Sequence, residues 1–216
     1  VPKYRGKPQA QKLMYMYCNT FYETKDYFTS NYQMERFVEA YPKSEKVEEI
    51  GFLSAKSYYM LSPVYSKDQS ETIIAIEKLQ DFINKYPNSE YMSKASILVR
   101  ELDYKLEKKA YNIALQYNIT GPFHRDYNSA ISAFDSFLIE FPGSAFKEDA
   151  LFYKFDSAYK LATNSVTRKE SERVEKALNY YNSLLFVFPE TKYSEQLKEM
   201  YQDLQEIQNK TTTTKS

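Results

Sequence analysis

Four short stretches of the sequence repeat one pattern, an aromatic residue followed by proline, a variable residue and serine or threonine: YPKS at 41–44, YPNS at 86–89, FPGS at 141–144 and FPET at 188–191. Proline has no backbone N–H and disfavours helical geometry in the residue before it, so each stretch should end a helix. The serine or threonine is a suitable N-cap for the next helix, and acids follow at Glu48, Glu148 and Glu195, where the helix dipole favours negative charge. Each stretch therefore predicts a joint between two helices.

The residues before each joint share one helical face. Counting back twelve, eight and five positions from each proline gives a small residue and then two large ones: Ser30, Met34 and Phe37; Ala75, Leu79 and Phe82; Ala130, Phe134 and Phe137; Ala177, Tyr181 and Leu184. The spacing i, i+4, i+7 is helical, and it matches the second half of the tetratricopeptide pattern. Cys18 stands where the first half of that pattern has glycine, which indicates a structural role. We predict an all-α fold, an α-solenoid of about four tetratricopeptide-like hairpins plus a C-terminal helix.

The joints after the first follow at intervals of 45, 55 and 47 residues, longer than the 34 residues of the standard repeat. We place the extra residues in loops at 61–71, 118–126 and 164–172, which are polar or contain glycine and proline. The stretch 90–116 contains no helix breaker and predicts a helix about 40 Å long.

The expected domain organisation follows from these joints. An N-terminal extension covers 1–8, the tetratricopeptide-repeat domain covers 9–209, and a disordered tail covers 210–216, where KTTTTKS has little apolar content. The approximate repeats are 11–43, 44–88, 89–143 and 144–190, followed by a final helix over 192–209.

Several function classes find little support in the sequence. The formal net charge is zero and basic residues form no cluster, which argues against nucleic-acid binding. Phosphate-binding glycine loops and a G-x-S-x-G nucleophile sequence are absent. The one histidine, His124, lies in the expected GPFHRD loop without a companion ligand. We therefore expect no catalytic residues, no metal site, no cofactor and no enzymatic activity.

A second regularity runs forward from the first three joints. Ten, fourteen and seventeen residues past their prolines stand an apolar residue, a charged residue and tyrosine: Phe52, Lys56 and Tyr59; Ile97, Glu101 and Tyr104; Phe152, Asp156 and Tyr159. In stacked hairpins the first helices line the concave surface, so these faces could bind a partner. Alternatively, they pack against the neighbouring repeat.

The chain resembles the BamD family of outer-membrane assembly lipoproteins, also called the ComL or YfiO family. The likeness is carried by SP-x-Y-x-x-DQ and the helix AI-x-x-LQ-x-F within 61–90, by ELDYKLEKKAYNIALQY at 101–117 and by ALFYKFDSAYKLATNS at 150–165, and it covers 9–205. It implies a non-enzymatic scaffold of about five hairpins, held by an N-terminal lipid at the periplasmic face of the outer membrane.

The resemblance also implies partners. The family joins the β-barrel assembly machine, contacts the POTRA domains of the BamA-type barrel subunit through C-terminal repeats, here about 126–205, and receives unfolded outer-membrane proteins through N-terminal ones. The lipid-bearing cysteine and the family's first hairpin are not in this sequence, and Cys18 within a helix cannot replace the former. A generic repeat adaptor for other cell-envelope proteins needs only the repeats, and an enzyme on the same fold would need a catalytic cluster that the sequence does not show.

Overall fold

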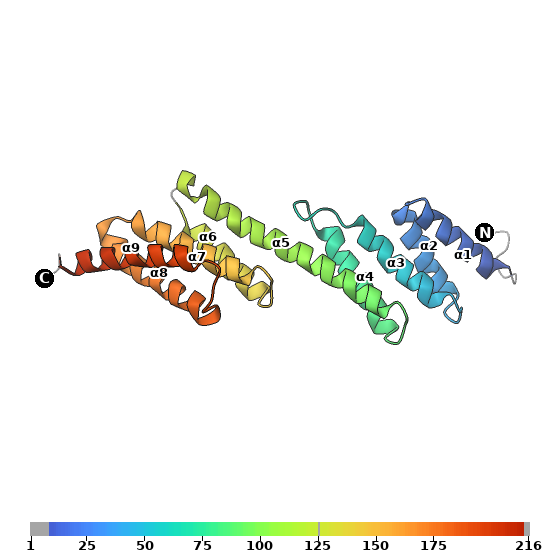
Figure 1. The fold of residues 1–216 in the computed structure, drawn as a ribbon. Helices are drawn as coiled ribbons and strands as arrows, with labels where there is room; N and C mark the ends of the chain where they lie inside the picture. Colours follow the sequence, from blue (N-terminus) through green and yellow to red (C-terminus); the bar gives the residue numbers. More distant parts are fainter. Residues whose placement is uncertain (1–8, 125, 214–216) are drawn as a thin grey trace. The chain divides into compact units, whose positions relative to one another are not determined.

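The computed structural model describes residues 9–124 and 126–213, and across them the secondary structure is helical throughout, without a strand (Figure 1). The helices are α1 (Ala10–Glu23), α2 (Tyr27–Ala40), α3 (Val47–Leu61), α4 (Ser70–Lys85), α5 (Met92–His124), α6 (Asn128–Glu140), α7 (Lys147–Thr163), α8 (Thr167–Val187) and α9 (Ser194–Thr213). They form the expected series of hairpins, α1/α2, α3/α4, α5/α6 and α7/α8, followed by α9. The all-α repeat fold predicted from the joints is confirmed.

Each joint ends one helix and begins the next, with one correction to its detail. The helices α2, α4, α6 and α8 stop just before the four aromatic-Pro pairs. The next helix starts three residues past the joint serine or threonine, because an extra turn intervenes, closed in the first joint by a backbone bond from Val47 N–H to Ser44 C=O of 3.0 Å. The Ser44 hydroxyl accepts from the Lys46 N–H at 3.1 Å, so it caps this turn and not the helix itself.

The face predicted from the positions before each proline is the core of the fold. Of its twelve residues all are buried except Tyr181, which is half-buried. Cys18 is fully buried in the cluster that contains Met14, Met34 and Phe37, and burial raises the pKa of its thiol to about 11. The structural role predicted for this cysteine fits that environment.

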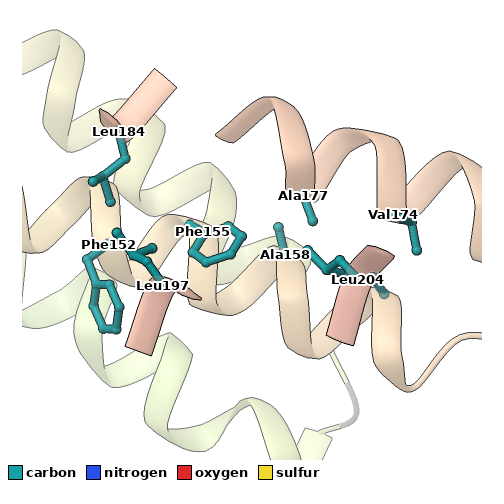
Figure 2. Packing of buried hydrophobic residues seen from close by; sticks show 9 residues of the cluster. Phe152, Phe155, Ala158, Val174, Ala177, Leu184, Leu197 and Leu204 are labelled. Atoms are coloured by element: carbon teal, nitrogen blue, oxygen red, sulfur yellow. The ribbon is translucent and has the colours of Figure 1, made fainter. Parts of the chain in front are cut away.

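The chain packs as two compact units, Val1–Leu106 and Glu107–Ser216, and the boundary falls inside α5. The first unit contains α1 to α4 and the N-terminal part of α5, with a core that joins Phe52, Leu79 and Leu102. The second contains the remainder of α5 and α6 to α9. Its largest core cluster gathers residues of α7, α8 and α9 (Figure 2). Whether 9–209 acts as one repeat domain stays a prediction.

The loop predicted over 118–126 is wrong for 118–124, because α5 continues to His124 with Pro122 inside its last turn. Buried Asn118 is anchored by its side-chain amide, which donates to Asp156 Oδ2 at 2.7 Å and to Ser157 Oγ at 2.8 Å. Gly121 lies so close beneath Tyr127 that an added Cβ would be 2.5 Å from a ring carbon. These tertiary contacts hold the backbone helical where glycine and proline alone would favour a break.

Two further boundaries differ from expectation. The loop predicted over 164–172 is shorter, since α7 ends at Thr163 and α8 begins at Thr167. This short loop is held by Arg173 of α8, whose guanidinium donates to Ser165 Oγ at 2.7 Å. The final helix runs past Asn209 to Thr213, because extending a formed helix adds one backbone bond for each residue ordered. The rest of the expected tail, 214–216, and the extension over 1–8 lie outside the described residues.

Candidate partner-binding surface

The two phenylalanines of the predicted partner face are part of the core and not of a surface. Phe52 and Phe152 are buried, and each stacks on the tyrosine four positions past the next joint proline. The Phe52 and Tyr91 ring centroids are 5.1 Å apart, and those of Phe152 and Tyr193 are 3.7 Å apart with an interplanar angle of 5°. Both phenylalanines therefore pack one repeat against the next, which is the alternative that the sequence had left open.

Two of the three tyrosines at the seventeenth position, Tyr59 and Tyr159, join their own helix to a later one. Tyr59 on α3 donates its hydroxyl hydrogen to the Glu101 carboxylate on α5 at 2.7 Å, and Tyr159 on α7 donates to Asp203 on α9 at 2.6 Å. The hydrogen bond to Glu101 raises the pKa of Tyr59. Burial, followed by the bond to Asp203, raises the pKa of Tyr159 to about 12. The same inter-helix bond thus occurs once in each unit.

The charged residues Lys56 and Asp156 also have partners on other helices. The Lys56 ammonium lies 5.9 Å from the centroid of the Tyr22 ring on α1. The Asp156 carboxylate, mostly buried, accepts from Lys160 at 2.6 Å and from the Asn118 amide. Both side chains hold neighbouring helices of their own unit together, so neither is a clear surface contact.

Three of the nine predicted residues remain exposed, and all three lie on α5. Ile97 and Tyr104 are each 47% exposed, and Glu101 lies between them on the same helical face, because residues four and seven apart align on a helix. Glu101 also accepts the Tyr59 bond. Of the predicted partner-binding residues in the first unit, those that a partner can reach most readily are therefore Ile97, Glu101 and Tyr104, which we call the α5 face.

The sequence analysis did not identify the buried face of the first helices, although a regular spacing in the sequence indicates it. The residues eight and fifteen positions past every joint proline are all fully buried or nearly so: Ile50, Ala95, Ala150 and Leu197 at the first position, and Ser57, Leu102, Ser157 and Leu204 at the second. A spacing of seven residues returns to the same helical face. Asp203 was missed as well, because the pattern was not extended past the fourth joint.

The SP-x-Y-x-x-DQ stretch forms a closed loop between α3 and α4. Gln69 is buried, and its amide donates to the carbonyls of Val64 at 2.9 Å and Lys67 at 3.0 Å. Its carbonyl oxygen accepts from Thr72 at 2.8 Å, and the Thr72 and Ser62 hydroxyls are 2.6 Å apart.

The same loop is tied to the next first helix. Lys105 on α5 donates to the Ser62 hydroxyl at 2.6 Å, and desolvation lowers the pKa of its ammonium. Ser62 precedes proline and has the extended backbone that proline requires there. These polar residues therefore serve to fix a loop.

No metal site and no membrane-spanning helix is found in the part of the chain that the structure describes. The His, Cys, Asp and Glu side chains of 9–124 and 126–213 form no group of three that could hold an ion. None of the helices in these ranges has the length and apolar character that crossing a bilayer requires. His124 is the last residue of α5, and its side chain lies outside the described part.

Helix pairs joined at proline turns, with aromatic stacking between successive pairs, define a tetratricopeptide-like repeat protein. The particular family is given by comparison with known sequences. The chain belongs to the YfiO family of outer-membrane lipoproteins, whose model matches residues 2–124 and 123–211.

Several curated relatives carry the name outer membrane protein assembly factor BamD. One assigned as such in Aquifex aeolicus (strain VF5) is 33% identical over 167 residues, which is 77% of this chain and 53% of the relative. One from Rickettsia prowazekii (strain Madrid E) is 24% identical over 150 residues, or 69% of this chain and 57% of the relative. The chain thus spans about half the length of these relatives.

Proposed function

We propose that this chain is the repeat region of an assembly factor for outer-membrane β-barrel proteins, and that it acts by binding other polypeptides and not by catalysis. The observation that carries the proposal is the YfiO family match over 2–124 and 123–211, together with relatives named as BamD assembly factors. The fold agrees with this role, because stacked helical hairpins present extended surfaces to partners. A generic envelope adaptor would not require the specific SP-x-Y-x-x-DQ loop or the family match.

The finer proposal concerns partners and location. The C-terminal repeats, over about 126–205 of the second unit, would contact the POTRA domains of a BamA-type barrel subunit and other subunits of the β-barrel assembly machine. The first unit would receive unfolded outer-membrane proteins. The molecule would act at the periplasmic face of the outer membrane, held by an N-terminal lipid.

The α5 face is the proposed contact for unfolded chains. Ile97 and Tyr104 offer apolar surface, and the tyrosine hydroxyl can also hydrogen-bond to a polypeptide backbone. Glu101 places a carboxylate between them. This combination suits segments that alternate apolar and polar residues, as the strands of membrane β-barrels do.

Site-specific photocrosslinking tests this contact. A photoreactive residue at position 97 or 104 should crosslink to a urea-diluted outer-membrane β-barrel protein. Helix α5 supplies a matched control, since Ile113 and Tyr117 are of the same types and are 49% and 47% exposed. Equal crosslinking from 97 and 113 would show that the α5 face has no special role.

A second experiment tests the assignment to the assembly machine. Affinity purification of the full-length protein from detergent-solubilised envelopes should recover a BamA-type barrel subunit. Recovery of other envelope proteins without any barrel subunit would refute the assignment and support the generic adaptor.

A further inference from the structure

A polar cavity of about 600 Å³ lies in the second unit, where the end of α5 and the start of α6 meet the turn from α7 to α8. Its volume is within the roughly 300–1,000 Å³ that small-molecule sites occupy. In the first unit, the turn from α3 to α4 is filled by 62–69, with buried Gln69 bonded inside it. In the second unit, the turn from α7 to α8 is only 164–166, and the cavity lies beside it.

The hydroxyl of Tyr127 indicates that the cavity holds a ligand. Tyr127 lines the cavity, is 7% exposed, and packs its ring over Gly121. Among the described residues its hydroxyl has no hydrogen-bond partner, whereas buried tyrosines usually have one. Every fully enclosed side-chain nitrogen or oxygen in this part of the chain does have a partner. The Tyr127 hydroxyl must therefore reach accessible space, and the space that its side chain lines is the cavity.

The charged groups that line the cavity are hydrogen-bond donors. They are Lys160 and Arg173, both half-buried, and no carboxylate of the described residues joins them. Lys160 pairs with Asp156 at 2.6 Å, but an ammonium group has three donors and this pair uses one. Arg173 holds the turn through Nη1 alone, at 2.7 Å from Ser165 Oγ, so its Nε–H and Nη2–H groups stay available. The cavity therefore offers donors to the oxygen atoms of an anion.

Two asparagines of the lining offer the opposite kind of group. The side-chain nitrogen of Asn164 donates to the Lys160 carbonyl at 2.8 Å, and that of Asn128 donates to Asp126 Oδ1 at 3.0 Å. Because both amide nitrogens are directed at acceptors, both amide oxygens are left to accept hydrogen bonds. Such acceptors beside cationic donors suit a ligand that carries hydroxyl groups and one anionic group.

We propose that this cavity binds a polyol phosphate. Tyr127, Lys160 and Arg173 donate to the phosphate oxygens, and the oxygens of the two asparagines accept from hydroxyl groups of the ligand. A phosphate suits the three donors better than a carboxylate, because it presents three strong acceptor oxygens. The same chemistry occurs in free glycerol and sugar phosphates and in the headgroup of phosphatidylglycerol. The inference goes beyond the proposed function and does not depend on it.

Amide NMR of the full chain tests the proposal with sn-glycerol 1-phosphate as the probe, and with glycerol and inorganic phosphate as comparisons. The probe should shift the side-chain amide signals of Asn128 and Asn164 in a saturable way. Glycerol should bind at least about tenfold more weakly, since it forms no charge-assisted bonds. Inorganic phosphate should also bind more weakly, because it lacks the polyol hydroxyl groups. A missing saturable shift would overturn the proposal, and so would equal binding of inorganic phosphate, which would show an adventitious ion only.

Tyr127→Phe keeps the test independent of folding, because it removes a hydroxyl without removing a bond within the protein. This variant should melt at the same temperature or higher, yet bind the probe about tenfold more weakly. Tyr111→Phe is the matched control, since Tyr111 is 8% exposed, belongs to the same unit and does not line the cavity. It should leave binding unchanged. Full binding by Tyr127→Phe would overturn the proposal.

A charge variant tests the anion directly. Arg173→Gln should weaken the probe about tenfold or more, while Arg168→Gln, which removes the same charge from an exposed position of α8, should not. Equal binding by the two variants would contradict the proposed role of Arg173.

Flotation with phosphatidylglycerol vesicles separates the two sources of the ligand. Binding to the vesicles that Tyr127→Phe weakens would identify the lipid headgroup, and binding of glycerol phosphate without vesicle binding would identify a soluble polyol phosphate. Both outcomes support the site. None of these results bears on the barrel-subunit assignment, which the envelope purification tests separately.

Discussion

Truncation of Phe152 should destabilise the protein far more than truncation of Ile97, although both residues stand ten positions past a joint proline. Phe152 is 7% exposed and belongs to the core cluster that includes Leu197 and Leu204 (Figure 2). Phe→Ala changes at such sites cost about 3–5 kcal/mol of unfolding free energy, from lost burial and the cavity left behind. Ile97 is half-exposed, so Ile97→Ala should cost no more than about 1 kcal/mol.

A double-mutant cycle isolates the contribution of the ring stack. Phe152 lies flat on Tyr193, with centroids 3.7 Å apart, and aromatic pairs contribute about 0.5–1.5 kcal/mol beyond their burial. Tyr193→Ala also removes a hydrogen bond to Asp149 of 2.8 Å. The unfolding free energy lost by this single variant therefore combines the ring stack with that hydrogen bond. The coupling free energy between Phe152→Ala and Tyr193→Ala removes that contribution and should fall in the stated range.

Urea denaturation followed by far-UV circular dichroism measures all four variants, with equal slopes as the check that the unfolded states are comparable. The reasoning fails if Ile97→Ala costs as much as Phe152→Ala. It also fails if the coupling between the two rings is zero, because the stack would then add nothing to burial.

Three further predictions follow from the polar and titratable groups. Gln69→Ala should lower the unfolding free energy, measured by urea denaturation, by about 1–3 kcal/mol, since it leaves loop carbonyls such as that of Val64 without their donor. The control Gln80→Ala, on the exposed face of α4, should change the unfolding free energy by less than about 0.5 kcal/mol. The pKa of Tyr159 is raised from 10.0 to about 12 by burial and by its bond to Asp203, so its contribution to stability should be complete below about pH 10 and decline as the pH rises toward 12. The stability difference between the protein and Tyr159→Phe should therefore be constant from pH 6 to about 9 and then shrink; a difference that grows with pH would have the wrong sign. Because burial raises the pKa of Cys18 to about 11, a thiol reagent at pH 8 should label it only after unfolding in urea, and rapid labelling of the native protein would contradict its burial.

Much of the fold could be predicted from local sequence alone. A proline disfavours helix continuation because of its own ring and missing N–H, so the four joints and the hairpins between them could be predicted directly. The burial of Met34, Leu79 and Phe134 followed as well, because one apolar stripe on a helix must face the core.

The partner face could be predicted only in part, because residues at the same spacing are buried in some helices and exposed in another. The position ten past the joint proline is core in α3 and α7, where Phe52 and Phe152 are buried, but surface in α5, where Ile97 is exposed. The positions fourteen and seventeen are partly buried in α3 and α7 and exposed in α5. The buried face of α5 runs through Ala95 and Leu102 instead. Which residues of a helix meet a neighbour depends on how that neighbour is rotated, and sequence spacing does not contain this angle.

Most helices, the joints and the class of fold could be read from short stretches of sequence, since these features depend on backbone chemistry within a few residues of each proline. Which side chains stay exposed to a partner depends on how the helices pack, and this became known from the structure. The tertiary structure also carried α5 through Gly121 and Pro122, against their local preference, because Asn118 is bonded to α7 and Tyr127 covers the glycine. Contacts between distant segments can supply more free energy than one residue's conformational preference costs. At such positions tertiary contacts therefore determine the backbone conformation.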